Sequence, residues 1–82
     1  MIRTVLVDDE IDSILILKNL LEIYCPTVKI VGEANSVNTA LQLIETHSPD
    51  LLLLDIAMNN ENAFDLLNRL PATDFQVIFV TA

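Results

Sequence analysis

The segment Val5-Leu6-Val7-Asp8-Asp9-Glu10 carries three apolar residues directly into three adjacent carboxylates. The residues from Arg3 to Val7 are rich in β-branched side chains, which is typical of a buried strand. Two like charges about 4 Å apart repel by about 4 kcal/mol at an effective dielectric constant near 20. A strand that ends in such a cluster therefore needs a compensating interaction, and the rest of the sequence indicates which one.

The first half of the chain alternates between helical and strand patterns. Residues 11–24 predict a helix, because Ile14, Leu17 and Leu21 recur at helical spacing before a proline. Residues 28–33 alternate in the manner of a strand near the edge of a sheet. Ser36 is a suitable N-cap for a second, more amphipathic helix that ends near His47.

The second half continues the same alternation. Residues 51–54 are all leucine, as expected for a strand covered on both faces. Residues 56–61 are polar and loop-like, residues 62–70 predict a short helix with Phe64, Leu67 and Leu70 inward, and residues 76–80 predict a last strand. The order β-α-β-α-β-α-β indicates a single α/β domain with right-handed crossovers and a parallel sheet.

Composition narrows the classes of function. The chain has 82 residues and a formal net charge of −8, which argues against direct contact with nucleic acid by this segment. The longest apolar run, Leu51 to Leu54, is far too short to span a membrane. Cys25 is the only cysteine, so no internal disulfide can form, and we expect a reducing, cytoplasmic setting.

Carboxylates follow two of the predicted strands. Asp8 and Asp9 come after the first strand and Asp55 comes directly after the third. Ligand sites in open parallel sheets lie beyond the carboxyl ends of the strands, so these acids share one rim if the two strands are neighbours. A hard cation with oxygen ligands would offset their repulsion, and Mg²⁺ suits such a site.

The same rim carries groups that suit phosphoryl chemistry. An aspartate beside a bound divalent cation can act as a nucleophile on a phosphoryl group. The hydroxyl of Thr81, at the end of the last strand, could donate a hydrogen bond to a phosphoryl oxygen. Acids at residues 8–10 also have a simpler interpretation, because carboxylates at the start of a helix favour its dipole.

The motifs VLVDDE, PDLLLLDIAM and VIFVTA together resemble the receiver domain of two-component response regulators, the CheY-like family. The resemblance covers the whole chain and implies a flavodoxin-like doubly wound parallel sheet with strand order 2-1-3-4. It implies that Asp55 is the phosphoacceptor, that Asp8, Asp9, Asp55 and the Ala57 carbonyl serve Mg²⁺, that Thr81 is the switch hydroxyl, and that the Ala82 amide lies beside it.

The resemblance also implies partners. The expected phosphodonor is a sensor histidine kinase, and the expected output, outside this chain, is transcription control. The stretches GEANS, DLLLLDI and FQVIFVTA look most like receivers that precede LytTR-type DNA-binding domains. On this interpretation the chain takes an active part in its own phosphorylation but is not a turnover enzyme.

Several positions depart from the family pattern. Asn59 stands where the family usually has proline and Ala63 where it usually has glycine. Residues 1–82 would be a partial receiver that lacks the fourth helix, the fifth strand with its lysine, and the fifth helix. The apolar last strand would then be an uncovered edge, and we expect the chain to associate with itself.

Two rival functions remain open at this point. A pseudo-receiver would use the same fold as a protein-interaction module without phosphorylation, which Asn59, Ala63 and the missing lysine favour. A haloacid-dehalogenase-type phosphatase would require Asp, any residue, Asp near the first strand end. Here Glu10, two residues after Asp8, stands where the pattern requires its second Asp, so the match is poor.

Overall fold

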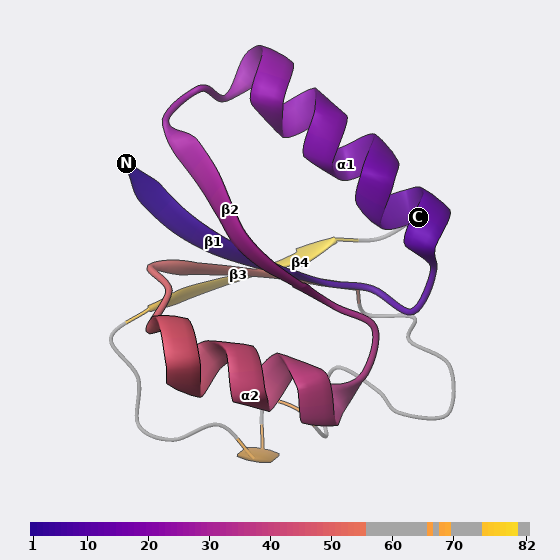
Figure 1. Ribbon diagram of the computed structural model, residues 1–82, viewed down its shortest axis with the longest axis vertical. Helices are drawn as coiled ribbons and strands as arrows, with labels where there is room; N and C mark the ends of the chain where they lie inside the picture. The colour runs from indigo at the N-terminus through magenta and orange to yellow at the C-terminus, as the bar shows by residue number, and fades with distance from the viewer. Residues whose placement is uncertain (56–65, 67, 70–74, 81–82) are drawn as a thin grey trace.

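The computed structural model describes residues 1–55, 66, 68, 69 and 75–80 (Figure 1). Its elements are β1 (Ile2–Val7), α1 (Ile11–Tyr24), β2 (Val28–Ala34), α2 (Val37–His47), β3 (Leu51–Asp55) and β4 (Gln76–Val80). Each of these was predicted from the sequence, with ends that differ by at most one residue. Leu66, Asn68 and Arg69 are helical, whereas Phe64, Leu67 and Leu70 lie outside the described residues.

The four strands form one parallel sheet in the order β2-β1-β3-β4. α1 covers one face and α2 covers the other (Figure 1), which is the flavodoxin-like doubly wound arrangement predicted above. Leucine-rich β3 lies inside the sheet, between β1 and β4, and its residues Leu52 and Leu54 are fully buried. Burial on both faces explains why β3 is a continuous apolar run rather than an alternating one.

Two apolar layers hold the sheet and helices together. On the α2 face, Val5 and Val7 of β1 pack with Leu52 and Leu54 of β3 and with α2. On the α1 face, Leu6 and Leu53 pack with Ile14. The alternation of these residues along β1 and β3 follows the two-residue repeat of a strand, so the hydrophobic pattern fixes which face each side chain takes.

Asp50 ties together the amino ends of three strands, opposite the carboxyl rim. Its carboxylate accepts a hydrogen bond from the Arg3 amide at 3.0 Å, and its own amide donates to the Arg3 carbonyl at 2.8 Å. The Asp50 carbonyl also accepts from the Gln76 amide at 3.0 Å. These bonds fix how β1, β3 and β4 start relative to one another, and therefore where they end.

Helix α2 begins at a side-chain cap. The Ser36 hydroxyl accepts a hydrogen bond from the Thr39 amide at 3.2 Å, as the sequence predicted. Replacing such a cap by alanine removes a partner for an amide that has none within the helix, at a cost of about 0.5–2 kcal/mol.

We predict that Ser36→Ala lowers the free energy of unfolding by about 1 kcal/mol in urea titrations followed by circular dichroism. Ser13→Ala is the matched control, because Ser13 lies within α1 and its hydroxyl donates to the Glu10 carboxylate at 3.5 Å instead of capping a backbone amide. Alanine favours a helix interior, so this control should leave stability unchanged or slightly higher. Equal losses in the two variants would contradict the assignment of Ser36 as the cap.

Candidate functional site

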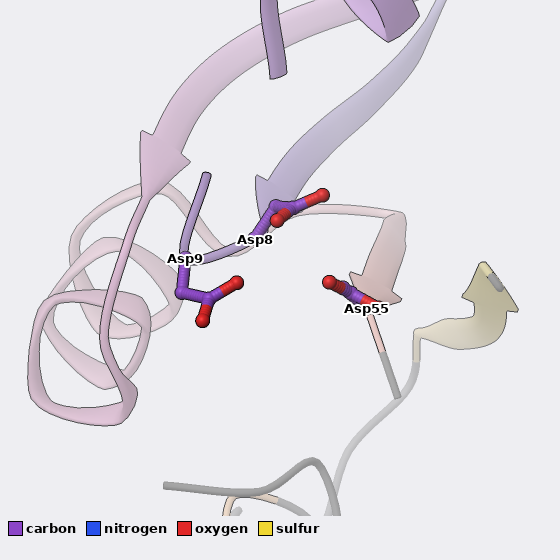
Figure 2. Close-up of side chains that lie close together, drawn as sticks. All are labelled: Asp8, Asp9 and Asp55. Atoms are coloured by element: carbon purple, nitrogen blue, oxygen red, sulfur yellow. The ribbon is translucent and has the colours of Figure 1, made fainter. Parts of the chain in front are cut away.

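The carboxyl ends of β1 and β3 bring three aspartates together. Val7 of β1 lies opposite Leu54 of β3 in the parallel register, so Asp8 and Asp55 follow at adjacent positions on the rim. Carboxylate oxygens of Asp8, Asp9 and Asp55 all lie within 4.8 Å of one another. Figure 2 shows the carboxylates of Asp9 and Asp55 turned toward a shared space, with Asp8 beside it. The sequence predicted this convergence.

Local hydrogen bonds hold Asp8 in place at the strand end. Its amide donates to the Ala34 carbonyl of β2 at 3.0 Å. Its Oδ1 accepts from the Glu10 amide at 2.9 Å, which turns the chain into α1. Glu10 itself is the N-cap residue, but its side chain makes no capping hydrogen bond. Asp8 therefore both supports the start of the helix and contributes to the acidic cluster.

Within the acidic cluster, Asp8 has an unfavourable environment for the charged form of its carboxyl group. Partial burial raises the pKa of Asp8 above its ordinary value of 3.8. The negative charge of Asp55 and a side-chain hydrogen bond between Asp8 and Asp55 raise this pKa further. The hydrogen bond from the Glu10 amide acts in the opposite direction. Burial first, and the neighbouring carboxylates second, disfavour the charged form of Asp8, and a cation bound at this rim would favour it.

Apolar residues close the space behind the acids. A small cavity between α1 and the sheet is lined by Asp8 and Asp55 at its rim and by apolar side chains beneath: Leu6, Val7, Ile14, Leu17, Leu53 and Val80. Sequence analysis did not assign Leu17 or Val80 to the site. The sequence indicated these two positions only through their neighbours. Leu17 lies three residues after Ile14 on the same helix face, and Val80 directly precedes Thr81.

The donor set fits a hard divalent cation. All three side chains offer carboxylate oxygens, all are half-buried, and their spacing allows one ion to contact more than one of them. The other predicted contributors, Ala57, Thr81 and Ala82, lie outside the described residues, as do Asn59 and Ala63. The described residues of the predicted site are therefore the three acids of the cluster.

The described residues thus combine a parallel α/β sheet with an acidic cluster beyond the ends of two adjacent strands. The family described as response regulator receiver domain matches residues 4–82. The chain belongs to this family, whose members in two-component systems are phosphorylated by histidine kinases.

Individual relatives support the same assignment. The chain is 39% identical over 88 residues to the sensory transduction protein LytT of Bacillus anthracis, with all of this chain and 34% of that protein covered. It thus spans about a third of the length of that relative.

Solved structures agree with the sequence relatives. The response regulator domain of Thermotoga maritima CheB superposes with a TM-score of 0.85 at 29% identity, covering 99% of this chain and 60% of that one. A signal receiver domain from Mycobacterium tuberculosis gives a TM-score of 0.84 at 28% identity, over 98% of this chain and 65% of that one. In the described residues, neither helix is long and apolar enough to cross a bilayer.

We predict that Asp8→Asn raises the thermal midpoint of the metal-free chain at neutral pH, because asparagine has no charged form for burial and the charge of Asp55 to disfavour. A raised pKa means that the folded chain binds the proton more tightly than the unfolded chain. Stability therefore falls as pH rises from about 3.8 through the folded pKa, and asparagine removes this loss. The asparagine oxygen can still accept from the Glu10 amide.

Asp12→Asn is the control, because Asp12 is exposed in the first turn of α1 and favours the helix dipole. Its loss should leave the midpoint unchanged or slightly lower in the same calorimetric scans. A midpoint for Asp8→Asn that falls with that of the control would show that repulsion at the rim is not a net cost.

Proposed function

We propose that this chain is the phosphoacceptor module of a two-component response regulator, phosphorylated on Asp55 with Mg²⁺ by a histidine kinase. The single observation that carries the proposal is the cluster of Asp8, Asp9 and Asp55 at the carboxyl ends of two adjacent parallel strands. Carboxylates gathered beyond the carboxyl ends of parallel strands lie where such sheets bind ligands, and their oxygens suit a hard cation.

The metal site would use oxygens from both strands. Asp8, Asp9 and Asp55 supply the side-chain oxygens, and the Ala57 carbonyl is the proposed main-chain ligand. Mg²⁺ accepts one or two carboxylates and keeps several waters, which suits three half-buried acids at an open rim. When bound, the ion neutralises charge on the phosphoryl oxygens.

Asp55 would act as the nucleophile. One of its carboxylate oxygens attacks the phosphorus of a phosphohistidine, so that a phosphorus–oxygen bond forms as the phosphorus–nitrogen bond breaks. The departing imidazole nitrogen keeps the electron pair of the broken bond. The position of Asp55 at the end of β3, with its carboxylate turned toward Asp9 in Figure 2, leaves it accessible from the rim.

Thr81 and Ala82 would respond to the new charge. A phosphoryl group on Asp55 presents strong acceptor oxygens, to which the Thr81 hydroxyl and the Ala82 amide are the proposed donors. Both residues follow β4, which is paired with β3 in a register that sets Val80 opposite Asp55. Donation from Thr81 would draw the end of β4 toward the site and change the surface around it.

The relatives support a proposed biological setting. Similarity to LytT, a sensory transduction protein, supports a role in a cytoplasmic signalling pathway that ends in transcription control. The LytTR-like stretches support an output by DNA binding, made by a separate domain rather than by this acidic segment. The sensor histidine kinase is the proposed phosphodonor.

Phosphorylation can be tested without the kinase. We expect the chain, incubated with acetyl phosphate and Mg²⁺, to gain the mass of one phosphoryl group, to lose it to hydroxylamine, and to gain none after chelation. Asp55→Asn should abolish the gain, whereas Asp12→Asn should retain it. Beryllofluoride with Mg²⁺ should shift the amide resonances of Asp55 and Thr81 in NMR spectra.

Unchanged spectra and no added mass in the unsubstituted chain would instead support the pseudo-receiver, a protein-interaction module of the same fold. Steady turnover of a generic phosphomonoester would support the phosphatase. Comparison of Asp55→Asn with Asp12→Asn separates phosphorylation of Asp55 from nonspecific labelling, because Asp12 lies in α1 and outside the acidic cluster.

A further inference from the structure

β2 contains a bulge that changes which face its residues take. Thr4 of β1 pairs with Ile30 of β2, whereas the next residue of β1 pairs with Gly32. Val31 is therefore an extra residue on β2. Val31 packs in the apolar layer on the α2 face, and a Cβ on Gly32 would also point to α2. Two consecutive residues thus lie on one face of the sheet, which a regular strand does not allow.

The bulge decides the environments of the two residues that follow it. Counted from Ile30, which packs on the α1 face, strict alternation would place Glu33 on the α2 face and Ala34 on the α1 face. Instead the Glu33 carboxylate contacts the Lys18 ammonium of α1 at 2.8 Å, and Ala34 is buried on the α2 face. The charged and the apolar side chain reach these environments only in the shifted register.

The shifted register also brings the end of β2 to the acidic cluster. Ala34 lies opposite Val7, the last residue of β1, and its carbonyl accepts the hydrogen bond from the Asp8 amide at 3.0 Å. Without the bulge, Glu33 would lie opposite Val7 with its carboxylate in the apolar layer on the α2 face, which is strongly disfavoured. β2 therefore cannot escape a local clash by slipping one residue.

Gly32 is the point at which the bulge approaches α2 most closely. A Cβ on Gly32 would lie 3.0 Å from Cδ1 and 3.1 Å from Cδ2 of Leu43, inside the usual carbon separation of about 3.5–4.0 Å. The φ angle of Gly32 is not positive, so the strand uses the missing side chain rather than the freedom of the glycine backbone. Any other residue at this position has to displace Leu43 or β2.

We propose that Gly32 is a positioning residue for the acidic cluster, because its missing side chain lets β2 keep the bulge that holds Asp8. The ligand role of Asp8 rests on the proposed function. Leu43 packs against the apolar layer on the α2 face, so its displacement disturbs that layer. A Cβ at Gly32 therefore pushes β2 away from α2, which weakens the hydrogen bond between Asp8 and Ala34 and moves the Asp8 carboxylate.

Such a movement affects a bound cation more than it affects the fold. Metal coordination requires ligand distances within about 0.2 Å of their ideal values, whereas hydrogen bonds in proteins extend over a range of about 0.5 Å. Loss of the groups that hold a ligand in place typically lowers metal affinity by about 10–100-fold. Gly32 should therefore influence ion affinity separately from its effect on stability.

Three variants of the 82-residue chain separate positioning from packing. Gly32→Ala should weaken Mn²⁺ binding by about tenfold in calorimetric titrations at neutral pH. Leu43→Ala removes the side chain that the new Cβ would meet, so it should lower the urea midpoint but leave the Mn²⁺ affinity within about twofold. The double variant should recover most of the affinity lost in Gly32→Ala, although its urea midpoint stays below that of the unsubstituted chain.

The outcomes that oppose the proposal are equally specific. Full Mn²⁺ affinity in Gly32→Ala would show that Leu43 gives way and that β2 does not move. An affinity that falls with the urea midpoint in all three variants would assign both residues to packing alone. Loss of the fold in Gly32→Ala, checked by circular dichroism, would assign the glycine to folding. Each of these results would overturn the positioning role.

Hydrogen exchange of the metal-free chain provides a readout that does not involve an ion. The Asp8 amide should exchange faster in Gly32→Ala, relative to the amides of β3, and should return to its original rate in the double variant. Unchanged exchange at Asp8 in Gly32→Ala would contradict the proposal. An unsubstituted chain that binds no Mn²⁺ would count against the proposed function, whereas exchange at Asp8 decides the role of Gly32 by itself.

Discussion

The parallel pairing of β1 with β3 is the constraint on which the site depends. It sets Val7 opposite Leu54, and one step further along the chain it sets Asp8 beside Asp55. Hydrogen bonds between Arg3 and Asp50 tie the starts of the two strands together and hold this register. Burial of Leu52 and Leu54 on one face and Leu53 on the other packs β3 into the core. Backbone pairing and apolar packing thus place carboxylates that would otherwise separate.

The carboxyl rim holds three acids in a setting that disfavours the charged form of Asp8. The fold brings three acids within 4.8 Å, and partial burial together with the charge of Asp55 raises the pKa of Asp8. Hydrogen bonds from Asp8 to Ala34 and Glu10 compensate in part by fixing the strand end and the start of α1. A cation and a phosphoryl group bound here would convert the remaining repulsion into affinity, which is a reason to keep such a cluster.

Sequence patterns predicted the described elements, because periodicity and burial are local properties of β3 and of α2 with its Ser36 cap. The acidic cluster was predicted only on the condition that the first and third strands are neighbours. Strand order came instead from the family resemblance, since periodicity assigns a face but not a neighbour. Burial of Leu66 was not foreseen within the third helical segment. The bond from the Glu10 amide to Asp8 was also missed, because it depends on backbone geometry between strand and helix.

Crystals of the chain soaked in Mn²⁺, a divalent ion that takes oxygen ligands and gives an anomalous signal, test the central claim most directly. The account predicts one strong anomalous peak within coordinating distance of oxygens from both strand ends, Asp55 on β3 and Asp8 or Asp9 after β1. An ion held by the acids of one strand alone would contradict the claim that β1–β3 pairing builds the site.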